Sequence, residues 1–243
     1  MILYPALDLL DGKAVRLTRG DYATAKVYSE NPAAVLADFR QKGAVYAHIV
    51  DLNGARDPAS RQKDRIEPLL KNCGLKVQIG GGVRAQRDAE QLIEWGADRV
   101  VLGSAAVADP ALVEGLIAAL GPSRITLAVD VHIGPDGVAY AAIKGWTEIT
   151  DAKLETLIAR YRAKGLQRVL CTDISRDGAA LGPNPEMYRA LTAVFPGLQV
   201  QASGGVRHLS DLEILKAAGA HSAIIGRALY EGTLDLGEAL KSC

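Results

Sequence analysis

Gly80-Gly81-Gly82-Val83-Arg84 decides the fold, because it returns 123 residues later as Ser203-Gly204-Gly205-Val206-Arg207. Other landmarks recur at nearly the same separation. Gly96-Ala97 reappears as Gly219-Ala220, Val100-Val101-Leu102-Gly103-Ser104 as Ala223-Ile224-Ile225-Gly226-Arg227, Asp8 as Asp130, and Asp51 as Asp173. The separation is about half of the 243 residues, so the chain reads as two similar halves.

Short apolar runs rich in β-branched residues alternate with segments of helical spacing. We expect strands at Ile2–Leu7, Val45–Val50, Lys76–Ile79, Arg99–Leu102, Ile125–Val129, Gln167–Thr172, Leu198–Ala202 and Ser222–Ile225. We expect helices at Pro32–Lys42, Arg87–Trp95, Pro110–Leu120, Asp151–Lys164, Pro185–Val194 and Asp211–Ala218. This alternation indicates an α/β protein with a parallel sheet. Eight strands in two equal halves favour one (β/α)8 TIM barrel domain over residues 1–243, built from two (β/α)4 halves, and an open doubly wound sheet is the alternative.

The composition fits a soluble globular protein and argues against several classes of partner. Lys and Arg number 28, as do Asp and Glu, so no basic field attracts a nucleic acid or a membrane surface. Met1–Pro5 does not resemble a signal peptide, and three widely spaced cysteines fit reduced thiols in the cytoplasm. The four histidines lack ligand spacing. We therefore expect a cytoplasmic monomer without a metal, a nucleic acid or a membrane partner.

Glycines at the expected carboxyl ends of strands indicate phosphate binding. The active site of a (β/α)8 barrel lies at that end, glycine lets a bound group approach the backbone, and amides at helix N-termini suit phosphate. One Gly-Gly pair alone would be explained by a tight turn. Recurrence in both halves favours two phosphate sites, and hence a substrate with a phosphate at each end. The residues concerned are Gly81, Gly82, Gly103 and Ser104 in the first half and Ser203, Gly204, Gly205, Gly226 and Arg227 in the second.

Asp8 and Asp130 end the first and fifth expected strands, opposite each other across the barrel. A carboxylate that follows an apolar strand is rarely a core residue, because burying it unpaired is costly. Helix capping or ion pairing would explain the two aspartates. Their place between the proposed phosphate sites favours an acid–base pair instead, since carboxyls in different surroundings can serve as acid and base.

Asp51 and Asp173 form the analogous pair on the second and sixth strands. They either bind the ribose hydroxyls of a substrate or hold basic neighbours such as Arg16 and Arg84. The structural role is the favoured interpretation.

The segments after the first and fifth strands are long, at about 20 residues, where such loops usually run two to six. Loops of this kind tend to be lids. The first contains Arg16 and Arg19, and an arginine can clamp a phosphate. The second contains Trp146, whose indole either stacks on a heteroaromatic ring or anchors the loop by packing.

Several motifs in combination resemble the phosphoribosylformimino-5-aminoimidazole carboxamide ribotide isomerase family of histidine biosynthesis, and the resemblance runs end to end. They are Pro5-Ala6-Leu7-Asp8-Leu9, Val15-Arg16-Leu17, Val50-Asp51-Leu52-Asn53-Gly54-Ala55, Gly80-Gly81-Gly82-Val83-Arg84, Gly145-Trp146 and Thr172-Asp173-Ile174-Ser175-Arg176-Asp177-Gly178. The resemblance implies a (β/α)8 fold and an Amadori rearrangement of an aminoaldose to an aminoketose. It also implies a small substrate with two phosphates. No cofactor is needed, because a protonated imine is the electron sink.

The resemblance also assigns roles to residues. It implies that Asp8 is the general base and Asp130 the general acid, although the residue types alone would permit the reverse. It implies that Thr172 and Asp177 line the substrate site and that Trp146 packs on the substrate. One departure is visible: Ala179-Ala180 stands where the family usually has a threonine after Asp-Gly. The missing hydroxyl puts full catalytic efficiency in question.

Three alternatives share much of this pattern. The cyclase subunit of imidazole glycerol phosphate synthase has the same fold, repeat and aspartates, but usually carries a cysteine at the position of Ala6 and lacks the motif Gly145-Trp146. A bifunctional isomerase that also acts on phosphoribosyl anthranilate would use the same chemistry. A non-catalytic phosphosugar-binding barrel is disfavoured by the presence of both Asp8 and Asp130.

Overall fold

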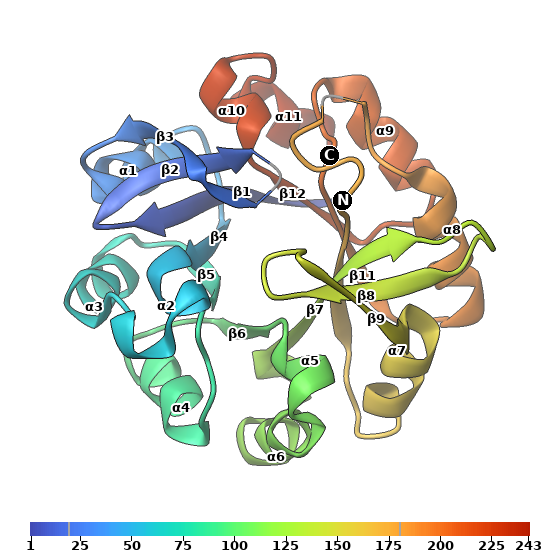
Figure 1. Ribbon diagram of the computed structural model, residues 1–243. Coiled ribbons are helices and arrows are strands. Elements are labelled where there is room, and N and C mark those ends of the chain that lie inside the picture. The colour runs from blue at the N-terminus through green and yellow to red at the C-terminus, as the bar shows by residue number, and fades with distance from the viewer. Residues whose placement is uncertain (19, 180) are drawn as a thin grey trace.

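Eight parallel strands form a closed barrel within residues 1–18, 20–179 and 181–243, which are the residues that the computed structural model describes (Figure 1). The strands are β1 (Ile2–Leu10), β4 (Tyr46–Asp51), β5 (Lys76–Gly80), β6 (Arg99–Leu102), β7 (Ile125–Ile133), β10 (Arg168–Asp173), β11 (Gln199–Ser203) and β12 (Ser222–Ile225). They pair in chain order, and the pairing of β12 with β1 closes the ring. The predicted barrel is confirmed and the open sheet is excluded.

Helices surround the barrel on the outside. They are α1 (Pro32–Gln41), α2 (Leu52–Arg56), α3 (Lys63–Asn72), α4 (Gln86–Glu94), α5 (Ala105–Ala108), α6 (Pro110–Leu120), α7 (Leu154–Arg162), α8 (Pro185–Val194), α9 (Leu209–Ala217), α10 (Arg227–Glu231) and α11 (Leu236–Ser242), with 3-10 turns η1 (Pro58–Ser60) and η2 (Pro122–Arg124). All six predicted helices are present. Asn31, Asp109 and Asn184 cap α1, α6 and α8, each followed by a proline that suits the first helical position. None of the helices in the described part of the chain could cross a membrane.

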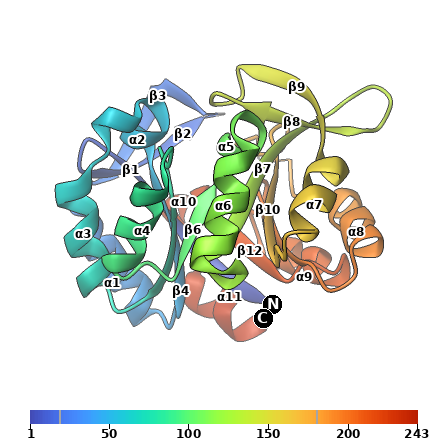
Figure 2. The ribbon, with the colours of Figure 1, turned by 90° about the horizontal axis from the view of Figure 1, so that it is seen from below.

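The long segments after β1 and β7, expected from the sequence to be long loops, form hairpins whose strands were not predicted. β2 (Lys13–Thr18) and β3 (Asp21–Ser29) follow β1, and β8 (Ala139–Ile143) and β9 (Glu148–Lys153) follow β7. Figure 2 shows both hairpins at the end of the barrel away from the chain termini. β9 takes up the start of the predicted helix Asp151–Lys164. Because β1 and β7 continue into the hairpins, Asp8 and Asp130 lie inside these strands and not at their ends.

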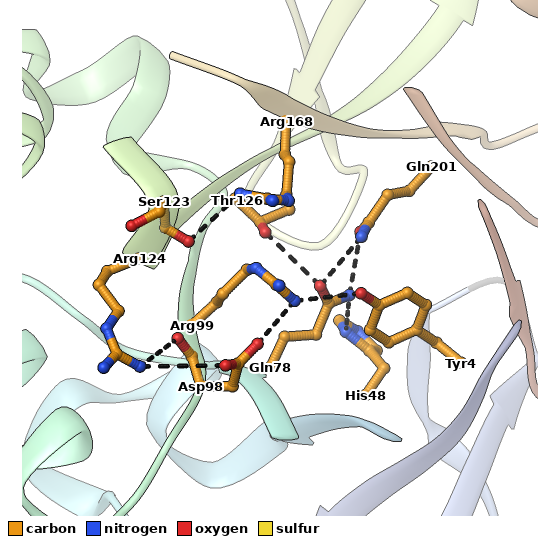
Figure 3. A network of polar contacts seen from close by, with 10 residues as sticks. All are labelled: Tyr4, His48, Gln78, Asp98, Arg99, Ser123, Arg124, Thr126, Arg168 and Gln201. Atoms are coloured by element: carbon orange, nitrogen blue, oxygen red, sulfur yellow. Dashed lines mark hydrogen bonds and ion pairs between the residues drawn. The ribbon is translucent and has the colours of Figure 1, made fainter. Parts of the chain in front are cut away.

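The sequence repeat corresponds to a repeat of structure. Asp8 pairs with the first strand of one hairpin, opposite Val15, and Asp130 pairs with the first strand of the other, opposite Ala142. Between the halves, Gln78 and Gln201 exchange side-chain hydrogen bonds of 3.0 and 3.2 Å in the barrel interior (Figure 3). These glutamines are 123 residues apart, so the contact joins equivalent positions of the two halves.

Two glycines fix how the loops at the carboxyl end of the barrel pack. Gly82 has a φ of 71° and its Cα faces the backbone of Gly54, while Gly205 has a φ of 84° and faces the backbone of Gly182. A side chain at either position would enter the preceding βα loop and would hold a left-handed conformation that only glycine adopts freely. The tight-turn explanation therefore accounts for part of the glycine pattern.

We predict that Gly82→Ala lowers the free energy of unfolding by about 2–5 kcal/mol. The new Cβ would overlap the backbone of Gly54, and alanine is strained in the left-handed conformation that Gly82 adopts. The matched control is Gly115→Ala. Gly115 is exposed in the middle of α6 with open space around its Cα, so this change should stabilise the protein by about 1 kcal/mol. Urea denaturation of both variants checks the pair. Equal stability of Gly82→Ala and the unmodified protein would contradict the packing argument.

Candidate active site

Asp8 lies at the carboxyl end of the barrel in an ion pair with a residue of the first hairpin. Its Oδ2 is 2.9 Å from Nη1 of Arg16, and the Asp8 side chain is 13% exposed. Burial raises the pKa of Asp8, the Arg16 guanidinium lowers it, and the nearby Asp177 raises it again. The guanidinium therefore offsets part of the penalty that burial imposes on the ionised carboxylate.

Asp130 accepts hydrogen bonds from neutral donors, whereas Asp8 forms an ion pair with a cation. The indole Nε1–H of Trp146 donates to Asp130 Oδ2 at 2.8 Å. Burial raises the pKa of Asp130, hydrogen bonds from Trp146 and Thr172 lower it, and Asp177 raises it. A full positive charge stabilises a carboxylate more than neutral donors do. The pKa of both carboxyls is raised above the ordinary value, with burial as the main cause, but a cation opposes this at Asp8 and neutral donors oppose it at Asp130.

Asp177 couples the two carboxyls electrostatically. It lies in the loop after β10, where its backbone N–H donates to the carbonyl of Asp173 at 3.2 Å, and it raises the pKa of both Asp8 and Asp130. Thr172 is buried and stands in register with Asp130 on the neighbouring strand. The structure thus brings together four of the predicted site residues: Asp8 and Asp130 from one aspartate pair, and Thr172 and Asp177 from β10 and its loop.

Trp146 covers the site from a strained turn. Lys144, Gly145 and Trp146 have φ values of 54°, 65° and 72°, so three consecutive residues are left-handed and two of them are not glycine. The indole also packs close to Gly20 in the turn of the other hairpin. The two hairpins therefore meet above the aspartates. The sequence suggested stacking or packing for Trp146, and its hydrogen bond to Asp130 was not predicted.

Two of the residues predicted to bind phosphate in the second half, Gly226 and Arg227, lie beside the first hairpin. The Arg16 guanidinium lies directly against Gly226. Arg227 donates through Nη1 to the carbonyl of Gly178 at 2.7 Å and through Nη2 to the hydroxyl of Thr18 at 3.2 Å. These contacts tie the first hairpin and the β10–α8 loop to the start of α10. The predicted Arg19 lies outside the described residues, as does Ala180.

Gly103 and Ser104, which are predicted to bind phosphate in the first half, are more open. No described atom lies within contact distance of a side chain added at Gly103, Ser104 is exposed, and both residues line a cavity of about 30 Å³ that reaches Asp130. Phosphate binding at these positions stays a prediction. So does phosphate binding at Gly81, Gly82, Ser203, Gly204 and Gly205, which surround the two packed turns at the same mouth.

Asp51 and Asp173 have structural contacts, in agreement with the favoured interpretation. Asp51 is buried and accepts from the Gln62 side chain at 2.8 Å, and Asp173 accepts from the Asn184 side chain at 2.7 Å. Both partners lie 11 residues after their aspartate. The suggestion that these aspartates hold Arg16 was wrong, because Arg16 pairs with Asp8.

Arg84, the other basic residue suggested as a partner of these aspartates, is exposed, and its backbone N–H donates to the Asp88 carboxylate at 3.1 Å.

Among the described residues, no group of three or more His, Cys, Asp and Glu side chains is placed to hold a metal ion.

We predict that Asp130→Asn raises the free energy of unfolding at pH 7. The folded-state pKa of Asp130 lies above its unfolded value, so the ionised carboxylate costs stability as the pH rises through that range, and Asn removes this cost. The gain should vanish near pH 3, where the carboxyl is protonated in both states. Asp8→Asn is the comparison and should lower stability, since it leaves the largely buried Arg16 unpaired. Denaturant titrations across pH check both, and a destabilised Asp130→Asn would indicate a structural aspartate.

Comparison with known proteins gives one family for the whole chain. A family model described as histidine biosynthesis protein matches residues 2–235. A relative from Pectobacterium atrosepticum is 45% identical over 242 residues, covering 100% of this chain and 98% of the relative. One from Actinobacillus pleuropneumoniae is 45% identical over 240 residues, covering 99% of this chain and 96% of the relative. Both are named 1-(5-phosphoribosyl)-5-((5-phosphoribosylamino)methylideneamino) imidazole-4-carboxamide isomerase. The chain belongs to the histidine biosynthesis protein family.

Proposed function

We propose that the chain is the aldose–ketose isomerase of histidine biosynthesis that performs an Amadori rearrangement of the phosphoribosylformimino aminoimidazole carboxamide ribotide. One observation carries the mechanism: Asp8 and Asp130 stand at one barrel mouth in unlike surroundings, one with a guanidinium and one with neutral donors. The names of relatives that match over their whole length support the substrate. We further propose that the enzyme is cytoplasmic and monomeric.

The first step opens the ribose ring. Asp130, protonated because burial raises its pKa, gives its proton to the ring oxygen. The bond between C1′ and the ring oxygen breaks, and its electron pair stays on the oxygen as a hydroxyl. The amine nitrogen supplies the electron pair that makes C1′ a protonated imine. Trp146 and Thr172 then stabilise the carboxylate that Asp130 has become.

The second step moves a proton at C2′. Asp8, paired with the Arg16 guanidinium, acts as the base and removes this proton, and the electron pair moves into the protonated imine to give an enolamine. Tautomerisation places a proton on C1′ and leaves a ketone at C2′. Protons removed and added are equal in number, so the reaction needs no oxidant, and the imine itself accepts the electrons. The chemistry requires two carboxyls with separated pKa values and no cofactor.

The cyclase alternative is less consistent with the site. The motif Gly145-Trp146, which that family usually lacks, forms the turn that supplies a hydrogen bond to Asp130. The relatives cited above are also named as isomerases. An assay of purified protein on the histidine-pathway aminoaldose and, separately, on phosphoribosyl anthranilate tests the proposal. Turnover of the aminoaldose is expected. Turnover of both substrates would make the enzyme bifunctional, and turnover of neither would contradict the proposal.

We predict that Asp8→Asn and Asp130→Asn each reduce kcat by about 100- to 10,000-fold while substrate still binds. Deuterium at C2′ separates the roles. Residual turnover of Asp8→Asn should be limited by transfer of the C2′ proton and show a large primary isotope effect. Residual turnover of Asp130→Asn should be limited by ring opening and show a small one. The opposite pattern would reverse the assignment, and near-normal turnover would remove that residue from the mechanism.

We predict that Trp146→Phe moves the falling, alkaline limb of the kcat/KM profile to higher pH. Phenylalanine keeps an aromatic ring but lacks the donor that lowers the pKa of Asp130. An acid with a higher pKa stays protonated, and therefore active, at higher pH. Trp95→Phe is the control, because Trp95 is the other tryptophan in the chain and lies at the end of α4. An unmoved limb in Trp146→Phe would show that the hydrogen bond does not tune Asp130.

A further inference from the structure

Three arginines gather around one carboxylate at the amino end of the barrel, opposite the aspartate pair (Figure 3). Arg99 begins β6, Arg168 begins β10, and Arg124 ends η2 just before β7. Asp98, the residue before β6, forms ion pairs with Arg99 and Arg124, and its charge also acts on Arg168. Three guanidinium groups and one carboxylate leave a surplus of positive charge, and neutralising it would take two further negative charges.

Asp98 pairs poorly with the arginines around it. Its Oδ2 is 2.8 Å from Arg99 Nη1, but within the described residues this buried oxygen accepts no hydrogen bond, so the two groups are close without being aligned. Arg124 is 3.9 Å from the other carboxylate oxygen and donates instead to the backbone carbonyl of Asp98 at 3.0 Å. The single carboxylate therefore compensates the surrounding charge incompletely.

Within the described residues, the hydrogen-bond acceptors of Arg168 and Arg99 are neutral oxygens, and Arg99 Nη1 donates to the hydroxyl of Tyr4 at 3.1 Å. Arg168 donates to the carbonyl of Ser123 at 3.3 Å, a long hydrogen bond to a neutral group. The Arg99 side chain is 12% exposed, and its buried Nε has no hydrogen-bond partner in the described part of the chain. Burial lowers the pKa of Arg168, and the charge of Arg99 lowers it further, so the two guanidiniums repel each other.

Further basic groups surround this arginine cluster. Lys76, at the start of β5, lies over the ring of Tyr46, and so does Arg99. His221 lies just before β12, and burial followed by the charge of Arg168 lowers its pKa. Arg124 and Arg168 remain partly exposed, so an anion from solution can reach them.

We propose that the arginine cluster of Arg99, Arg124 and Arg168 binds a phosphate-type dianion at the amino end of the barrel. Guanidinium groups are well matched to phosphate, because their planar N–H donors can meet two oxygens at once. A dianion supplies the two negative charges that Asp98 leaves uncompensated. The site lies at the opposite end of the barrel from the catalytic aspartates and takes a ligand separate from the substrate of the proposed reaction.

Histidine NMR on the full-length protein tests the proposal, with inorganic phosphate as the probe. The ring signals of His221 are followed against pH, with and without phosphate, at an ionic strength held constant with sodium chloride. Phosphate should raise the pKa of His221, because a bound dianion offsets the charge of Arg168. Chloride alone should not. An equal effect of chloride would indicate simple screening and would overturn the proposal.

Arg168→Gln should weaken the phosphate-dependent change at His221 by at least about tenfold in apparent affinity. Arg162→Gln is the matched control, since Arg162 also donates only to carbonyls in the described residues, those of Leu166 and Pro196, and should leave the response intact. Arg124→Gln, at an exposed position, is a second variant should Arg168→Gln not fold. Unchanged isomerase activity establishes that each variant is folded. Unweakened phosphate binding in a folded variant of the cluster would overturn the proposal.

Ribose 5-phosphate in place of inorganic phosphate distinguishes two sources of the same group. Tighter binding of ribose 5-phosphate at His221 would assign the site to a phosphate monoester. Equal or weaker binding would assign it to free phosphate. Binding of neither would overturn the proposal, whatever the outcome of the isomerase assay.

Discussion

Burial of two carboxyl groups at one mouth of a closed barrel is the constraint on which the site depends. Burial raises the pKa of both carboxyls. In each half of the barrel, a hairpin at the equivalent position contacts the aspartate. The first hairpin supplies the guanidinium of Arg16 to Asp8, and the second supplies the indole N–H of Trp146 to Asp130. A nearly symmetric scaffold thus gives two chemically different carboxyls, which acid–base catalysis requires.

The barrel was predictable from sequence because its signals are local and repeated. Buried parallel strands appear in the sequence as short apolar runs, and the internal repeat indicates equal numbers of strands in the two halves. The hairpins were not predictable in this way. β3 has few buried residues and β9 has little apolar alternation, because both strands lie away from the core and face solvent. The helix α3 was missed as well, since Pro68 lies inside it and most of its residues are polar or charged.

The sequence identified the two candidate catalytic aspartates but not the residues that contact them. Asp8 and Asp130 follow apolar runs at equivalent positions, but the residue that each one contacts depends on hairpin register, which no periodicity reveals. Gln62 and Asn184 occupy equivalent positions in the two halves and donate to Asp51 and Asp173. A search for identical residues in the two halves does not pair them, because one is a glutamine and the other an asparagine. The two halves therefore repeat a hydrogen bond from a side-chain amide to a carboxylate, although the amino acids that donate it differ.

The two ends of the barrel carry different groups of charged residues. Asp8 and Asp130 lie toward the carboxyl ends of the strands, and the arginine cluster lies at the amino ends. In this fold the amino end usually serves stability. Mutually repelling guanidiniums around Asp98 do not serve it, because a buried polar group without a partner is destabilising. Replacing buried ionic groups by well-packed apolar side chains is often neutral or stabilising. The arginines therefore make physical sense as half of an ionic interaction whose other half is an anion from solution.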